Sequence, residues 1–447
     1  MKVFSILRQP IPDEMRALLK ARWLSLPSEL RNERQVVGRH LVHCGYTMGA
    51  SYCSFGCTHC YLPSNANRVP LPSLDEMRAQ IDANRRLIGP GGGLQITGGD
   101  VVDAYWRAGR TEELIELVRY ANRAGVVPML MTHGQVLLEH PWLLERLVKE
   151  GGLRKIALHI DITQAGRPGY PIRRLKSEAD LNPLRQAFVD LILGVRRSTG
   201  TSFFAAHTVT VTERNIASVP EILRWLLADP RRLGAFRMVS FQTEADVGRT
   251  RFSRSPPTPG ATWAQICRGL GAELPRDSLE FGHPDCSTMT SLLVLFPERR
   301  VINLIPSDPR SRAFWSRVLE VFGGTGARGE FPSESVLRKL SALARHPAML
   351  WRILEYAVRR MREEGLGPGF IGRALTGRVS ALNIVMHNFM SASDLQQPRR
   401  EVIETRLSAC SFRGAVRRNG EWAAIPMCEM NVDQRESIYA DQAGRST

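Results

Sequence analysis

The sequence predicts an α/β fold in which a parallel sheet is either doubly wound by helices or rolled into a barrel. Two observations carry this prediction. Short β-rich runs alternate with longer helical segments, and no GxGxxG motif follows the first run, which weakens a dinucleotide-binding fold. The strands are expected at residues 39–48, 93–99, 126–134, 155–162, 203–211 and 235–242. The helices between them are expected at residues 73–88, 110–125, 141–151, 180–198 and 215–230.

The chain is expected to have three parts. Residues 1–38 contain a short amphipathic helix that ends before Pro27, and residues 39–250 contain the repeated strand–helix units. The stretch 248–262 is rich in Pro, Ser and Arg, which is typical of a loop or linker. Residues 251–447 are expected to form a C-terminal α+β domain.

The C-terminal part has its own pattern. Residues 290–306 resemble a β-hairpin, and residues 333–364 form a helical block. A second hairpin is expected around the Asn419-Gly420 pair, because this dipeptide favours the type I′ turn that joins two antiparallel strands.

Composition is that of an ordinary globular protein, with 43% hydrophobic and 23% charged residues. No apolar run reaches the ~20 residues that a membrane span needs, and the first residues do not read as a signal peptide. We therefore expect a cytoplasmic protein. Thiols stay reduced in that compartment, so clustered cysteines are expected to be metal ligands or catalytic groups and not disulfides.

The chain is strongly basic. It has 60 Lys and Arg against 44 Asp and Glu, a net charge of +16. Such a field attracts anionic partners, including phospholipid surfaces, nucleic acid and phosphorylated substrates. An arginine-rich solvated surface without any such partner is the alternative.

Three of the eight cysteines lie within eight residues, at Cys53, Cys57 and Cys60, directly after the first expected strand. Gly56 between them permits a tight bend. Three thiolates from one loop can hold three irons of a four-iron cluster and leave the fourth iron open to an external ligand. The alternative is a zinc site, for which His59 would supply a fourth ligand.

The motif CSFGCTHC resembles that of the radical S-adenosylmethionine enzymes. The resemblance covers about residues 39–250 and implies a partial (β/α)6 barrel with this loop after the first strand. It also implies a [4Fe-4S] cluster on Cys53, Cys57 and Cys60, reductive cleavage of S-adenosylmethionine to a 5′-deoxyadenosyl radical, and an external one-electron reductant such as flavodoxin or ferredoxin. His59 takes the position of the family's usual aromatic residue near the adenine.

The end of the second expected strand also agrees with the resemblance. Thr97, Gly98, Gly99 and Asp100 are similar to the family's GGE-type motif, which holds the methionine amino group. The two glycines let backbone groups approach the ammonium, and Asp100 offers a carboxylate in place of Glu. A Gly-Gly turn that merely ends a strand is the alternative.

Two later strand ends follow the same pattern. Residues 131–134 resemble a TNG motif, in which Thr132 is kept and His133 replaces Asn. His159 and Asp161 resemble the segment whose polar side chains face the barrel mouth, and their spacing of two points them the same way. Ordinary polar groups at strand ends are the alternative.

Three further cysteines, Cys286, Cys410 and Cys428, lie beside Pro, Gly or Ser at expected strand ends. Cys410 and Cys428 flank the second hairpin, so its turn would bring their thiols together. The C-terminal part resembles the branch that contains tetraether lipid synthases and the class D methylases, which take carbon from methylene-folate. The matching residues are His283, Pro284, Cys286, Cys410, Pro426, Cys428 and Asn431.

That resemblance implies an auxiliary iron–sulfur site on Cys286, Cys410 and Cys428. Its fourth ligand stays open between Cys44, Cys267, a histidine and the substrate. Cysteines with a structural role only are the alternative. The chain lacks the cysteine-rich N-terminal extension of the tetraether enzymes, so their additional clusters are not expected.

The leading interpretation is a radical enzyme that abstracts hydrogen from an unactivated carbon and forms a carbon–carbon bond on a hydrophobic, lipid-like substrate. The basic charge is compatible with peripheral contact to an anionic membrane, and residues 335–358 could line an acyl channel or pack as an ordinary core. One alternative is a radical methylase of a small molecule or cofactor. Another is an iron–sulfur nucleic-acid-binding or sensing protein, which the cofactor-binding loops argue against.

Overall fold

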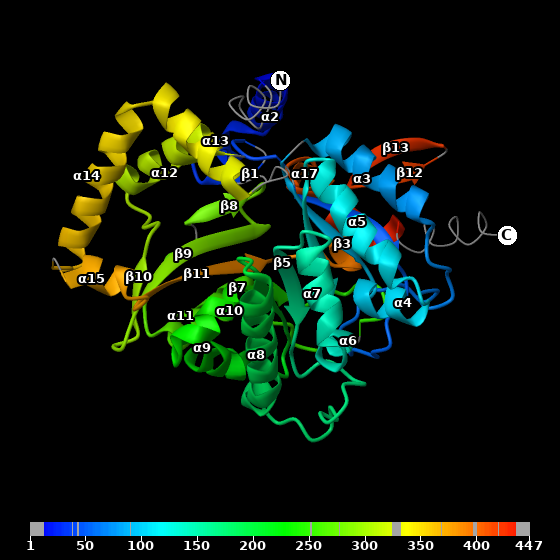
Figure 1. Cartoon of the computed structure of the whole chain (residues 1–447). Helices are drawn as coiled ribbons and strands as arrows, with labels where there is room; N and C mark the ends of the chain where they lie inside the picture. Colours follow the sequence, from blue (N-terminus) through cyan, green and yellow to red (C-terminus); the bar gives the residue numbers. More distant parts are fainter. Residues whose placement is uncertain are drawn as a thin grey trace.

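A computed structural model describes residues 13–434, apart from residues 38, 43, 90, 251–252, 277, 324–331, 368, 397–399 and 419. It shows an α/β fold in which one curled sheet forms a partial barrel with helices along its outer face (Figure 1). The predicted fold class is therefore confirmed.

Thirteen strands of the described residues belong to this sheet, in the order β1-β8-β9-β11-β7-β6-β5-β4-β3-β2-β12-β13, with β10 beside β9. Their bounds are β1 Gln35–Val37, β2 Cys44–Ala50, β3 Gly93–Gly98, β4 Val127–Thr132, β5 Lys155–His159, β6 Phe204–Val211, β7 Phe236–Thr243, β8 Leu279–Phe281, β9 Ser287–Leu295, β10 Arg300–Asn303, β11 Val379–His387, β12 Phe412–Arg418 and β13 Glu421–Pro426.

Strands β2 to β7 are the six that the sequence predicts, and neighbouring strands pair in parallel. Side chains alternate between the two faces of each strand. On β4, Leu130 packs into the hydrophobic core under the helices, whereas Met131 lines a cavity inside the curl. The main core therefore lies between the sheet and the outer helices.

The α-helices among the described residues are α2 Asp13–Leu24, α3 Leu74–Ile88, α4 Val101–Arg107, α5 Thr111–Arg123, α6 Gln135–Glu139, α7 Pro141–Lys149, α8 Asn182–Thr199, α9 Val219–Leu227, α10 Pro230–Ala235, α11 Pro259–Leu270, α12 Pro309–Phe322, α13 Pro332–Arg345, α14 Ala348–Glu363, α15 Gly369–Leu375, α16 Ala392–Leu395, α17 Arg400–Ser408 and α18 Met427–Glu429.

The long helices of the barrel form where apolar residues recur at helical spacing. In α5, Leu114, Leu117, Val118 and Ala121 are buried on one face, a stripe that packs against the sheet. The five helices predicted between the strands are all present. The short helices α4 and α6 were not predicted, because five to seven residues carry too little periodicity to be recognised.

Strands from both sides of residue 250 share the sheet. Strand β11 lies parallel to β7, and β12 lies parallel to β2. Gly414 permits the second contact, because a Cβ at that position would lie 2.2 Å from the Tyr46 ring. The Tyr46 hydroxyl donates to the carbonyl of Ile425 at 2.8 Å, so the C-terminal hairpin is bonded to the first barrel strand.

Both predicted C-terminal hairpins are present, as antiparallel pairs β9–β10 and β12–β13. Gly420 has the positive φ that a tight turn requires, while Asn419 lies outside the described residues. The predicted loop at 248–262 is too long. Helix α11 already begins at Pro259, where the Thr258 side chain accepts a hydrogen bond from the backbone of Ala261. None of the described helices combines the length and the apolar content needed to cross a bilayer.

Candidate active site

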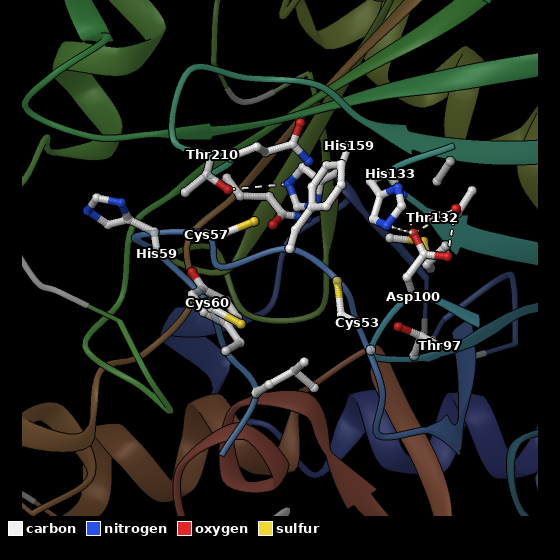
Figure 2. A pocket seen from close by; sticks show the side chains of 18 of the residues that line it. Cys53, Cys57, His59, Cys60, Thr97, Asp100, Thr132, His133, His159 and Thr210 are labelled. Atoms are coloured by element: carbon white, nitrogen blue, oxygen red, sulfur yellow. Dashed lines mark hydrogen bonds and ion pairs between the residues drawn. The ribbon is translucent and has the colours of Figure 1, made fainter. Parts of the chain in front are cut away.

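A cavity of about 200 Å³ opens where the parallel barrel strands end. Figure 2 shows its lining side chains, which come from the loop after β2, from the ends of β3 to β7 and from the C-terminal part. The sequence-predicted residues that line it are Cys53, Cys57, His59, Cys60, Thr97, Gly98, Gly99, Asp100, Thr132, His159 and Asp161.

The loop that carries the three cysteines is bonded to its surroundings through its backbone. Asn67 adopts a positive φ of 71° and accepts from the Cys53 amide at 3.0 Å, while its own amide donates to the Cys53 carbonyl at 3.1 Å. The Thr58 amide donates to the Thr163 carbonyl at 3.0 Å. The bonds of Asn67 thus hold the loop after β2 together, and the bond of Thr58 joins it to the loop after β5.

The three thiols of this loop face the same cavity and lie within electrostatic reach of one another. Burial raises the pKa of Cys57, and the charges of Cys53 and Cys60 raise it further. No three His, Cys, Asp or Glu side chains in the described part of the chain converge on a single metal ion. Three thiolates from one loop can each bind a different iron of a four-iron cluster, whereas a structural zinc site needs a fourth protein ligand.

Two arginines lie beside these thiols. Arg249 Nη2 donates to Cys60 Sγ at 3.3 Å, and the Arg249 amide donates to the Cys60 carbonyl at 2.8 Å. This approach requires Gly248, where a Cβ would lie 2.6 Å from the backbone of Tyr61. The guanidinium therefore sits where it can stabilise a thiolate.

Arg167 is the second of these cations. Its guanidinium lies 5.0 Å from the centre of the Phe55 ring, and its Nη2 donates to the His159 carbonyl at 3.2 Å and to Gln164 at 2.8 Å. Its Nε and Nη1 are buried and have no hydrogen-bond partner within the described residues. Burial lowers the pKa of Arg167 to about 10, although the charge of Cys57 opposes this. Two buried donors without partners are groups that a bound ion or water could satisfy. Arg167 itself does not line the cavity, although its partner Gln164 does.

Asp100 joins the ends of two strands. It is the N-cap of α4, where it accepts from the Asp103 amide at 2.9 Å. The same carboxylate accepts from Thr132 Oγ1 at 2.7 Å and from the His133 amide at 2.6 Å. It is buried and also lines the cavity. The structure thus shows a positioning role, and a contact to a ligand ammonium stays a prediction.

The glycines before Asp100 are required by the cysteine loop itself. A Cβ at Gly99 would lie 2.1 Å from the Tyr52 carbonyl oxygen, which accepts from the Asp100 amide at 2.8 Å. Gly98 has a φ of 141°, which favours glycine. Close packing of two loops therefore explains this motif, alongside the predicted approach of a ligand.

His133 is a site residue that the sequence indicated only weakly. Its ring stacks on Phe55 with centroids 3.8 Å apart. Its Nδ1 accepts from the Gln135 amide at 3.1 Å, which leaves the proton of the neutral ring on Nε2. That nitrogen lies 3.2 Å from Asp100 Oδ2. The stacked ring thereby supports the cysteine loop from β4.

His59 turns away from the three cysteines in Figure 2. Its Nε2 lies 2.9 Å from Glu244 Oε2 just after β7, and its Nδ1 contacts Thr58 Oγ1 at 2.8 Å. Burial would raise the pKa of Glu244, but hydrogen bonds from His59 and Ser253 bring it below its ordinary value. This pairing argues further against His59 as a zinc ligand. A position near an adenine stays a prediction.

His159 and Asp161 both line the cavity but differ in their contacts. His159 Nε2 lies 3.3 Å from Thr210 Oγ1, and its side chain keeps 36% exposure. Asp161 is buried, with Oδ1 accepting from the Thr163 amide and Oδ2 from the Thr210 amide, both at 2.9 Å. His159 therefore presents part of its ring to the cavity, whereas Asp161 is buried and holds two loops together.

The second cysteine set does not line this cavity, but its members also gather. Burial raises the pKa of Cys428, and the charges of Cys410 and Cys286 raise it further. Burial raises the pKa of Cys286 to about 11, and Arg406 lies within electrostatic reach of it. Helix α18 carries both Cys428 and Met427, and Met427 lines the cavity. Helix α18 thus connects the second thiol set to the wall of the cavity that the first set faces.

The fourth ligand of such a second site stays open. Cys44 interacts with Gln95 and Lys155 inside the barrel. Cys267 is a buried residue of α11, and its Sγ lies 3.7 Å from the Leu274 carbonyl. His283 is the histidine nearest in sequence, and its carbonyl accepts from the Cys286 amide at 2.9 Å.

No protein-family model matches the chain, and no curated protein matches it. Among solved structures, native anSMEcpe with bound AdoMet is similar at 14% identity and a TM-score of 0.33, over 51% of this chain and 57% of that chain. The hexahistidine-tagged anSMEcpe with bound AdoMet gives the same values. The FeFe-hydrogenase maturase HydG from Carboxydothermus hydrogenoformans is 13% identical with a TM-score of 0.37, over 83% of this chain and 88% of that chain. The chain thus spans little more than half the length of anSMEcpe.

Proposed function

We propose that this chain is a radical S-adenosylmethionine enzyme. One observation carries the proposal. Three thiols from one short loop face a cavity at the ends of parallel strands, and the fourth candidate ligand of that loop, His59, is paired with Glu244 instead. A four-iron cluster on Cys53, Cys57 and Cys60 would keep one iron open to a ligand.

The chain's own residues would bind and orient the ligands of this site. The cluster, when bound, supplies the electron that cleaves S-adenosylmethionine into methionine and a 5′-deoxyadenosyl radical. Arg167 has two buried donors without partners behind the cavity wall formed by Gln164. If a ligand carboxylate reached them, the contact would be charge-assisted and of the stronger kind. The side chains of Tyr61, Phe389 and Met427 provide an apolar wall, which would keep water from a reactive carbon.

Anaerobic reconstitution tests this proposal. The wild-type chain should bind about four irons at the first set and release 5′-deoxyadenosine from S-adenosylmethionine under a strong reductant. The triple variant Cys53→Ala/Cys57→Ala/Cys60→Ala should lose both properties. Cys267→Ala, a buried thiol outside the first set, is the matched control and should keep cleavage even if Cys267 is the fourth ligand of the second set. Cleavage by the triple variant would end the proposal.

We further propose that the second cysteine set holds an auxiliary cluster and that the product is a carbon–carbon bond on a hydrophobic, lipid-like substrate. The gathering of Cys286, Cys410 and Cys428 supports the first point, and the resemblance of the C-terminal part supports the second. Comparing the lipids of a deletion strain with those of its parent tests the substrate class. Unchanged lipids with an altered small-molecule methylation would favour the methylase alternative.

A membrane partner is supported by the helices at the outer edge of the C-terminal part (Figure 1). Of the thirteen exposed large apolar side chains in the described part of the chain, nine lie between residues 336 and 375. On α14, Leu350, Trp351, Leu354 and Val358 share one solvent-facing side, and Trp351 is 73% exposed. Exposed apolar patches of this kind mark interaction surfaces.

Basic side chains accompany this patch. Lys339, Arg345, Arg352 and Arg362 are exposed beside it. An apolar helix face with basic neighbours binds the surface of anionic membranes. We propose that α13 to α15 rest on such a surface. Sedimentation with vesicles should show binding that rises with anionic lipid content and falls in Trp351→Ser/Leu354→Ser, but not in the control Trp142→Ser. Self-association without vesicle binding would assign the patch to a second copy of the chain.

A further inference from the structure

The inside of the partial barrel is polar below the active-site cavity. On β5, Ala157 and His159 line the cavity, whereas Ile156 and Leu158 pack into the outer core. Side chains alternate along a strand, so Lys155 shares the cavity side with Ala157 and His159. Barrels of parallel strands usually fill this interior with branched aliphatic side chains. A lysine at this level is therefore unexpected.

Lys155 has an incomplete set of partners. Its Nζ contacts Met238 Sδ at 3.5 Å, and thioether sulfur is only a weak acceptor. Met129 is its register partner on β4. No Asp or Glu of the described residues forms an ion pair with it. An ammonium held inside a protein without a counter-ion is costly.

The neighbouring titratable groups do not neutralise this charge. Burial raises the pKa of Cys44 to about 11, so its thiol is neutral at pH 7. Burial lowers the pKa of His387 to about 4, so its imidazole is neutral as well. Gln95 lines the cavity, and its Nε2 lies 4.0 Å from Cys44 Sγ. Lys155 is half-buried, so part of its surface stays accessible, although it is not among the side chains that line the cavity itself. The barrel floor thus carries one positive charge that no carboxylate of the described residues offsets.

We propose that the barrel floor is an anion site, in which Lys155 binds the carboxylate or phosphate of a substrate that reaches down from the cavity. This anion site rests on the proposed function. It changes the expected substrate from a purely hydrophobic molecule to an amphiphilic one. Four strand residues separate the Cα atoms of Lys155 and His159 by roughly 13 Å. If Lys155 binds the anionic end of a substrate, a carbon roughly 13 Å from that end would therefore lie beside the cysteine loop.

The test uses the full chain without a cluster, so its outcome does not depend on radical chemistry. Calorimetry compares decanoate, the neutral analogue decanol and inorganic phosphate. The wild type should bind decanoate at least tenfold more tightly than decanol. Lys155→Met should remove that preference, and Lys155→Arg should retain most of it. Lys149→Met, on the exposed end of α7, is the matched control and should behave as wild type.

Each further outcome decides the proposal. Binding of phosphate alone, lost in Lys155→Met, would assign the site to a phosphorylated group. A preference for decanoate that survives in Lys155→Met, or no binding of any of the three probes by the wild type, would overturn the proposal. Lys155→Met should also unfold at the same temperature as the wild type or higher, since it removes an unpaired charge. A lower unfolding temperature would indicate a structural role instead.

Discussion

Thr132 Oγ1 lies 2.7 Å from Asp100 Oδ2, so the end of β4 holds the carboxylate that begins α4. This contact connects two of the strand ends that surround the cavity. The sequence alone indicated both residues as ligand-binding candidates, but the contact shows that they also support each other. Their two roles can be separated by mutation.

Thr132→Val should cost about 1.5–3 kcal/mol in the free energy of unfolding, because it removes a hydrogen bond to a buried charged group. Asp100→Ala should cost at least as much, since it also removes a helix cap. Urea unfolding of the chain without its cluster measures both. If Asp100 also contacts the ammonium of S-adenosylmethionine, only Asp100→Ala should weaken binding of that ligand tenfold or more. Equal affinities in the two variants would restrict Asp100 to its structural role.

Arg167→Met should lower the reduction potential of the first cluster. Reduction adds negative charge, and a nearby guanidinium stabilises it. Losing about 1.4 kcal/mol of this stabilisation would lower the one-electron reduction potential by ~59 mV. A redox titration followed by electron paramagnetic resonance measures the shift. Arg167→Lys should keep most of the potential, and Arg146→Met, on the exposed side of α7, should not change it. An unchanged potential in Arg167→Met would show that the Arg167 charge does not stabilise the reduced cluster.

Cys410→Ala/Cys428→Ala should reduce iron content and visible absorbance while the first cluster persists. Closing the long loop between Cys286 and Cys410 costs entropy that grows only slowly with length, so metal binding could secure the C-terminal part. Iron analysis beside S-adenosylmethionine cleavage checks this, because cleavage should continue. Full iron content in the double variant would refute the auxiliary site.

Lys155 should make stability depend on alkaline pH. Burial lowers its pKa in the folded chain below the ordinary value of 10.5. The unfolded chain therefore binds more protons between the two values, and stability rises with pH there. The stability advantage of Lys155→Met over the wild type should be largest near neutral pH and shrink as pH rises through 10.5. Urea unfolding at several pH values measures it, and a constant difference would contradict the burial of this charge.

The six barrel strands could be predicted because their signal is local. Each β-rich run is followed by a helical segment of sufficient length, such as residues 182–199 of α8. The pairing of β12 with β2 could not be predicted in the same way. It joins segments from opposite ends of the chain, and a hydrophobic pattern shows which face of a strand is buried but not which strand lies beside it.

The candidate site was predictable where a motif places several residues in one loop, as for Cys53, Cys57 and Cys60. Residues that act through long-range contacts were missed. Arg167 and Arg249 carry no local signal among the many arginines of the chain, and Glu244 becomes informative only when it is seen beside His59. Lys155 resembles an ordinary strand-edge residue until the curl of the sheet places it inside.

The pairing of β12 with β2 has a consequence for how the protein is made. The ribosome makes the cysteine loop well before Phe389, Met427 and Asn431, which line the same cavity. Contacts between such distant segments form slowly. Until those segments are made, the thiols of the loop stay accessible to oxidants and to metal donors. When the cavity is completed, it encloses the loop together with any metal that the thiols have already bound. Delivery of iron and completion of the fold must be matched in time.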